Sequence, residues 1–104
     1  MANMMKMIKQ AQAMQSKMQK LQAELAEREV EFSSGGGMVT ARATCNGTLK
    51  AIKIDPKVID PDDAELLEDL IFTAVNGALK LGQDTMTEEM GAITQGMNIP
   101  GMGF

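Results

Sequence analysis

The sequence contains no histidine, no tryptophan and no tyrosine, and it has a single cysteine among its 104 residues. Without histidine the chain lacks the most common general base and metal ligand, so we expect no enzyme, no metal or other cofactor and no small-molecule substrate. Cys45 alone cannot form an internal disulfide, which is typical of a reducing cytoplasm. The only aromatic residues, Phe32, Phe72 and Phe104, form no stacking platform for single-stranded nucleic acid.

Long apolar runs are also absent, so we expect no membrane-spanning segment, which would need about 20 consecutive apolar residues. The N-terminal segment lacks the apolar centre of a secretory signal peptide. A length of 104 residues with 44% hydrophobic residues predicts one soluble globular domain. A domain this small buries a limited core and often oligomerises to bury more.

Acidic residues are absent from positions 1–23, although the chain as a whole has a net charge of −4. This segment carries Lys6, Lys9, Lys17 and Lys20, interleaved with glutamines, so the chain is polarised into a basic end and an acidic remainder. One interpretation is a solvated helix surface. The other is a surface that contacts the phosphates of double-stranded DNA. A helix that is merely solvated usually carries charges of both signs. The absence of acids from this segment therefore favours the interpretation of phosphate contact.

Residues 3–29 contain no glycine or proline and predict one long helix of about 40 Å. Apolar residues recur at steps of three and four, as in a heptad seam. The small body cannot cover so long a seam, so we expect a second copy of the chain in a two-fold homodimer. The expected dimer interface is Met7, Met14, Met18, Leu21 and Leu25. The seam leaves a second hypothesis, in which its methionines form an adaptable groove and the chain is a protein-interaction module or holdase.

Alternating apolar and polar residues predict three strands, at 30–34, 38–45 and 48–54, in an antiparallel meander. Asn46-Gly47 favours a two-residue turn, which would pair Cys45 with Thr48, Ala43 with Lys50, Ala41 with Ile52 and Val39 with Ile54. Gly35-Gly36-Gly37 is interpreted as a tight turn at positive φ. A phosphate-binding loop would need a helix after the glycines, and a strand follows instead. A flexible tip that touches a partner is the remaining alternative.

Asp60 and Pro61 predict the start of a second helix at 61–90, with Asp60 as its N-cap. The nearby acids lack the spacing of a calcium loop, so we interpret them as capping residues. Gly77 and Gly82 weaken the helix and are expected to bend or fray it. Residues 91–104, rich in Gly and Met, predict a disordered tail. The fold class is therefore α+β, in the order helix, three-stranded meander, helix.

Two stretches, "GGGMVTARATCNGTLKAIKIDP" and "LLEDLIFTAVNGALK", together with the Met/Gln/Lys-rich segment before them, resemble the YbaB/EbfC family of nucleoid-associated proteins. The resemblance extends over residues 4–90 as a single domain. It implies an intertwined homodimer with a joined central sheet and two helical arms likened to tweezers. It also implies binding to DNA in the nucleoid with little sequence preference, a change in DNA conformation, and an influence on gene expression and DNA protection. The family's DNA contacts are attributed to the arms as a region.

Overall fold

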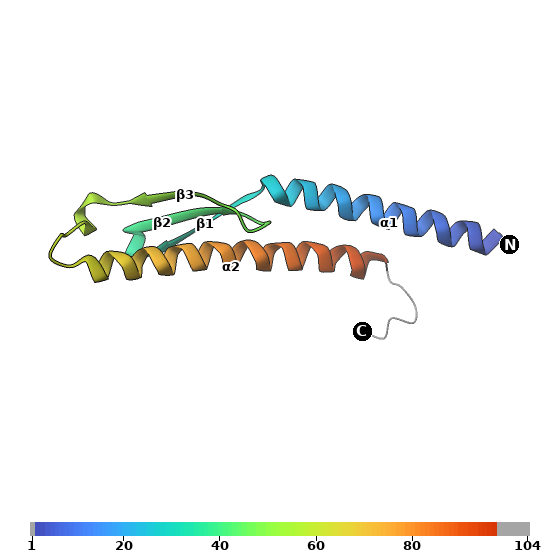
Figure 1. The fold of residues 1–104 in the computed structure, drawn as a ribbon. Helices are drawn as coiled ribbons and strands as arrows, with labels where there is room; N and C mark the ends of the chain where they lie inside the picture. The colour runs from blue at the N-terminus through green and yellow to red at the C-terminus, as the bar shows by residue number, and fades with distance from the viewer. Residues whose placement is uncertain (1, 98–104) are drawn as a thin grey trace.

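The computed structural model describes residues 2–97, and their elements follow the predicted order of helix, three strands and helix (Figure 1). The elements are α1 (Ala2–Glu27), β1 (Glu29–Ser34), η1 (Gly35–Gly37), β2 (Val39–Thr44), β3 (Leu49–Ile54), η2 (Pro56–Val58) and α2 (Ala64–Met97). The molecule is elongated, with extents of 74 × 25 × 15 Å. The sheet and most of α2 form a body, from which α1 projects as an arm (Figure 1).

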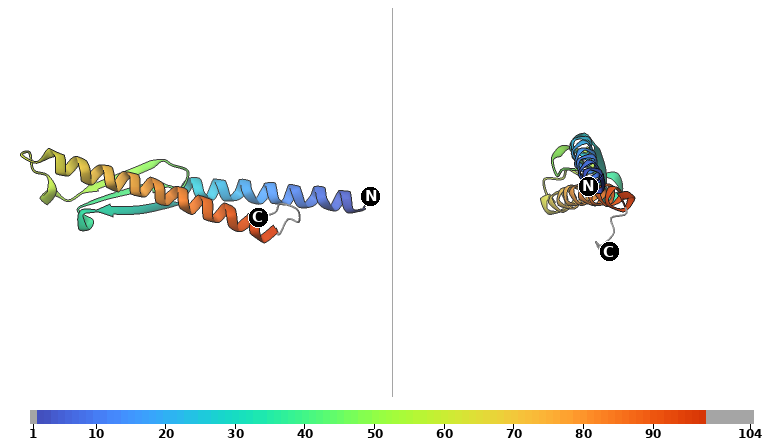
Figure 2. Two further views of the ribbon diagram at one scale, coloured as in Figure 1. Left: turned by 90° about the horizontal axis from the view of Figure 1, so that it is seen from below. Right: turned by 90° about the vertical axis from the view of Figure 1, so that its right-hand side faces the viewer.

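The three strands form one antiparallel sheet in the order β1-β2-β3, as predicted. One face of the sheet is covered by α2 (Figure 2). Polar side chains pair across the strands on the other face. The Ser33 and Thr40 hydroxyls lie 2.7 Å apart, and Arg42 Nε lies 2.7 Å from Glu29 Oε1. The alternation read from the sequence therefore separates an apolar face from a polar one.

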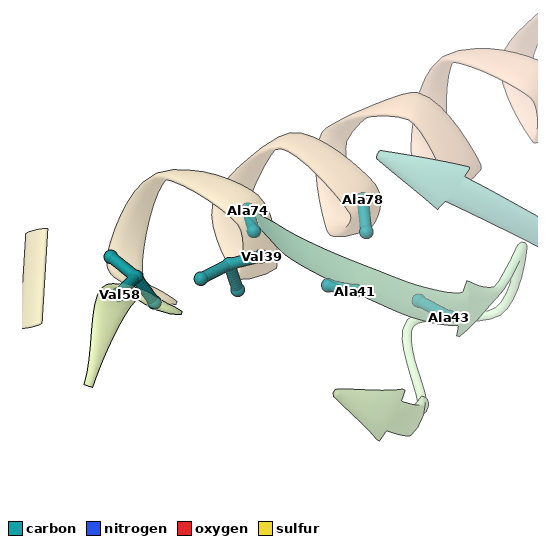
Figure 3. Packing of buried hydrophobic residues seen from close by; sticks show 6 residues of the cluster. All are labelled: Val39, Ala41, Ala43, Val58, Ala74 and Ala78. Atoms are coloured by element: carbon teal, nitrogen blue, oxygen red, sulfur yellow. The ribbon is translucent and has the colours of Figure 1, made fainter. Parts of the chain in front are cut away.

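The core consists of small side chains between β2 and α2 (Figure 3). Val39, Ala41 and Ala43 of β2 are completely buried, and so are Ala74 and Ala78 of α2. Because these side chains are short, the helix axis lies close to the sheet, and Val58 closes one end of the cluster.

Two glycines of α2 allow this close approach and do not interrupt the helix, which is continuous through both. A Cβ atom at Gly77 would overlap the ring of Phe32, and a Cβ atom at Gly82 would lie 2.9 Å from the Thr44 carbonyl oxygen. The expectation that these glycines bend or fray the helix was wrong, because the packing they permit holds α2 against the sheet.

The second helix begins and ends later than the predicted 61–90. Its N-cap is Asp63, whose Oδ1 accepts a hydrogen bond of 3.3 Å from the Leu66 N–H. Asp60 instead closes the preceding turn, where its Oδ1 accepts from the Asp62 N–H at 2.9 Å. Residues 91–97 are helical rather than disordered, and the rest of the predicted tail lies outside the described residues.

The turns are partly as predicted. Gly35, Gly36 and Gly37 have φ of 59°, 66° and 95°, which confirms the tight turn at positive φ. Val39 opposite Ile54 and Ala41 opposite Ile52 are also confirmed. The Asn46-Gly47 turn is different: the Thr44 N–H donates to the Thr48 carbonyl oxygen at 2.8 Å, which leaves a three-residue loop. A bulge then places Ala43 opposite Leu49 rather than Lys50, so the predicted pairs of Ala43 and Cys45 were wrong.

The Phe32–Gly77 contact predicts that the effect of Gly77→Ala on the free energy of unfolding changes sign when the Phe32 ring is removed. Gly77→Ala should lower the free energy of unfolding by about 1–3 kcal/mol, because the new methyl group meets the Phe32 ring. In a Phe32→Ala background the same change should raise it by up to about 1 kcal/mol, through helix propensity alone. Urea denaturation at fixed protein concentration measures both values.

Gly91→Ala is the matched control, since nothing lies within 4 Å of a Cβ atom at that helical position. It should be neutral or stabilising in both backgrounds. If Gly77→Ala stabilised the protein with Phe32 present, the proposed steric contact would be wrong.

Candidate nucleic-acid interface

The base of the arm is fixed to the body by three contacts. Leu25 of α1 is completely buried. The Arg28 carbonyl, just after the helix, accepts a hydrogen bond of 3.0 Å from the Cys45 N–H. The Arg28 guanidinium lies 3.3 Å from a carboxylate oxygen of Glu89 on α2. The direction of α1 is therefore set by both the sheet and α2.

Burial along the arm decreases from its base to its tip. Leu21, Met18 and Met14 are half-buried, whereas residues 3–13 are all exposed. The C-terminal part of α2 lies beside the base of α1 (Figure 2). The chain's own second helix thus covers part of the seam at the base of the arm.

The expectation that a second copy covers the seam stays a prediction, since one chain covers only the base and leaves residues 3–13 exposed. Of the five predicted interface residues, Leu25 is buried within one chain, and Met14, Met18 and Leu21 are half-buried there. Met7 is 68% exposed. Their role in a dimer stays a prediction.

All four arm lysines are exposed, and none is ion-paired, since the ion pairs within residues 2–97 are Arg28–Glu89 and Arg42–Glu29. At about 100° per residue, Lys6, Lys9, Lys17 and Lys20 fall within an arc of about 80° on α1. They form two pairs whose centres are about 16 Å apart along the axis. We call this set the lysine stripe.

A heptad repeat of 3.5 residues per turn would place Lys17 on the flank of the helix rather than among the other lysines. That assignment assumed 3.5 residues per turn, whereas a straight helix has about 3.6. The eleven-residue interval from Lys6 to Lys17 is close to three whole turns, so the two lysines lie over one another. The spacing of the lysines in the sequence therefore already predicts their common face, when 3.6 residues per turn are used.

Sequence reasoning missed a second group of exposed cations, on the body. Lys50 and Lys53 lie on β3, and Lys57 lies in η2. The bulge in β3 moves Lys50 out of its predicted pairing.

The body also has an apolar hollow along a flank of α2. Its volume is about 380 Å³, and it is lined by Glu68, Ile71, Phe72, Val75 and Asn76. Phe72 is 70% exposed, the largest exposed fraction among the bulky apolar residues described. The exposed Phe72 ring beside this hollow is the candidate contact point for a partner.

Within residues 2–97 no cluster of three or more His, Cys, Asp or Glu side chains is placed to hold a metal ion. The acids around Asp60 and Asp63 instead accept backbone hydrogen bonds. Among the same residues, no helix has the length and apolar character needed to cross a bilayer.

A helix whose lysines lack ion pairs, projecting from a small α+β body, is typical of the class of proteins that bind polyanions through contacts to the phosphate backbone. Comparison with known sequences identifies the family: residues 1–97 match the YbaB/EbfC DNA-binding family. The chain belongs to this family, which confirms the resemblance found in its sequence.

The relatives include proteins named nucleoid-associated protein from several bacteria. The one from Alkaliphilus metalliredigens is 48% identical over 100 residues, covering 96% of this chain and 88% of the relative. The one from Afipia carboxidovorans is 47% identical over 104 residues, covering 100% and 99%. A crystal structure of an uncharacterized protein from Helicobacter pylori has the same fold, with a TM-score of 0.69 and 20% identity over 81% of this chain and 88% of that one.

The anchoring of the arm predicts an asymmetric response to truncation of its apolar residues. Leu25→Ala should lower the free energy of unfolding by about 2–5 kcal/mol, because it leaves a cavity between α1 and the body. Met7→Ala, at an exposed position of the same helix, should change it by less than about 0.5 kcal/mol in the absence of a partner. Equal effects in urea denaturation would show that α1 is not anchored at Leu25.

Proposed function

We propose that this member of a DNA-binding family is a nucleoid-associated protein that binds double-stranded DNA as a homodimer, in the nucleoid of the cytoplasm. In this proposal the lysine stripe of each arm contacts phosphates. Two arms held by one body would grip a duplex at two places and change its conformation. The observation that carries the proposal is the lysine stripe itself, which is exposed, unpaired and free of acids.

The chemistry of the arm supports binding with little sequence preference. Lysine is a point charge on a flexible stem, suited to phosphate oxygens, and the neighbouring glutamines donate further hydrogen bonds. Arginine, the residue that most often reads guanine edges, is absent from α1. Its contacts should therefore position the protein on DNA without selecting bases.

Replacement of the lysine stripe tests where DNA binds. A variant with Lys6, Lys9, Lys17 and Lys20 changed to Gln should lose at least about 100-fold in affinity for a random-sequence duplex at low salt, because each lysine neutralises a phosphate. Fluorescence anisotropy measures the affinity, and circular dichroism shows whether the helices remain.

A matched control removes the same number of charges from the body, by changing Lys50, Lys53, Lys57 and Lys80 to Gln. This variant should keep most of its affinity. If the body variant lost binding and the arm variant kept it, DNA would bind on the sheet side of the molecule.

Homodimerisation is supported by surface that one chain leaves open. Both β1 and β3 are edge strands of the three-stranded sheet, and such edges pair readily with another chain. The hollow beside Phe72 is apolar and suits the same side chain of a second copy across a two-fold axis. We propose that the two copies meet through the Phe72 face of α2, with the sheets joined at their edges.

Charge at the centre of this face should therefore separate the copies. Phe72→Asp should weaken the dimer by at least about 30-fold, as loss of a buried aromatic anchor does. Thr73→Asp places the same charge at the adjacent exposed position and should leave the dimer intact. Sedimentation velocity over a range of concentrations distinguishes the two results, and a dimeric Phe72→Asp protein would exclude this face.

The second candidate is a protein-interaction module or holdase, supported by exposed apolar residues at the tip of the arm. Met4, Met7 and Ile8 are 68%, 68% and 53% exposed. Binding of an unfolded protein through these side chains should persist at high salt, whereas phosphate binding should not. Suppression of aggregation by the wild-type protein at about 1 M salt, where charges are screened beyond about 3 Å, would favour this candidate.

A further inference from the structure

The face of α1 that carries the lysine stripe changes sign near the base of the arm. Glu24 and Glu27 are both exposed, and their helical positions fall within the same arc of about 80° as the lysines. Only about 6 Å of helix axis separates Lys20 from Glu24. One continuous face therefore holds four positive charges toward the tip and two negative charges at the base.

The order of these charges opposes the helix macrodipole. Carboxylates stabilise the N-terminal end of a helix and cations stabilise its C-terminal end. In α1 the first turn contains no acid and the last turn contains no base, while the lysines lie toward the N-terminus and the glutamates toward the C-terminus. Helix stability does not explain this pattern.

Ion pairing within the helix does not explain the pattern either. Lys20 and Glu24 are four residues apart, but the lysine comes first, which is the weaker of the two orders. Within residues 2–97 neither glutamate takes part in an ion pair. Both carboxylates are left facing solvent beside the lysine stripe.

We propose that Glu24 and Glu27 form the inner boundary of the DNA interface. The inference rests on the proposed contact between the lysine stripe and DNA. Phosphates that approach the base of the arm meet two carboxylates within about one Debye length, which is about 8 Å at physiological salt. The duplex is thus held toward the arm tips, and kept from the body, where Lys50, Lys53 and Lys57 would otherwise attract it.

The boundary gives Glu24 and Glu27 a positioning role, so the test measures where DNA lies as well as how tightly it binds. Ser16 and Ala23 are exposed and one heptad apart, so they point in nearly the same direction, one beside the lysines and one beside the glutamates. Ser16→Cys and Ala23→Cys would each carry a photoactivatable crosslinker. The native Cys45 is 3% exposed and shielded from labelling, and the treated wild-type protein checks this.

With both glutamates present, a random-sequence duplex should crosslink to position 16 and not to position 23. In a Glu24→Gln/Glu27→Gln background it should crosslink to both, and anisotropy should show binding about three- to tenfold tighter at low salt. Asp62→Asn/Glu65→Gln makes the same charge change, at the same spacing and at exposed positions, on the far end of the body. That control should leave the crosslinks unchanged and alter the affinity less than about twofold.

Equal crosslinking from positions 16 and 23 with the glutamates in place would overturn the boundary while leaving DNA on the arm. Unchanged crosslinks in the Gln background would do the same. Binding in solution without a crosslink from either position would instead overturn the proposed function of the arm, and the boundary with it.

Discussion

The close contact between α2 and the sheet is the constraint on which the rest of the structure depends. Ala74, Gly77 and Ala78 present almost no side chain to β2 and Phe32, and Gly82 lies against the backbone of the hairpin loop. A larger residue at these positions would lift the helix from the sheet and open the core. Short side chains also bury little apolar area, so a single chain gains limited hydrophobic stabilisation from this core. The open edge strands and the exposed Phe72 are consistent with a body that buries more of its surface by pairing with a second copy.

The same helix links the core to the arm. Because α2 continues to Met97, its C-terminal part lies beside the base of α1, where Leu25 is buried and Arg28 pairs with Glu89. The base is thereby anchored to the body, while the tip projects beyond it with its lysines unpaired. An anchored base fixes the direction in which the charges are presented, and a projecting tip leaves them accessible to phosphates. The acidic remainder of the chain then limits where a polyanion can settle.

Local patterns predicted the order of the elements, the sheet topology, the positive φ of the glycine turn and two of the cross-strand pairs. The details that failed depend on contacts distant in sequence. From the sequence, Gly77 and Gly82 were expected to weaken the helix. The positions of Phe32 and Thr44 in the fold show why glycine is required there. The end of α2 was placed too early because the helix continues through Gly91 to Met97 despite the low helix propensity of glycine. The Asn46-Gly47 turn gained a residue because Thr44 pairs with Thr48. The lysines were identified correctly, but their common face depends on 3.6 rather than 3.5 residues per turn.

The central claim is that an arm of this shape holds DNA by its phosphates. The most direct test is the affinity of the wild-type protein for a random-sequence duplex, measured over a range of salt concentrations. If about four to eight phosphates are neutralised by two arms, the logarithm of the association constant should fall against the logarithm of salt with a slope of about −4 to −7. Two duplexes of unrelated sequence should give the same line. A slope near zero, or tight binding that persists at high salt, would contradict the account.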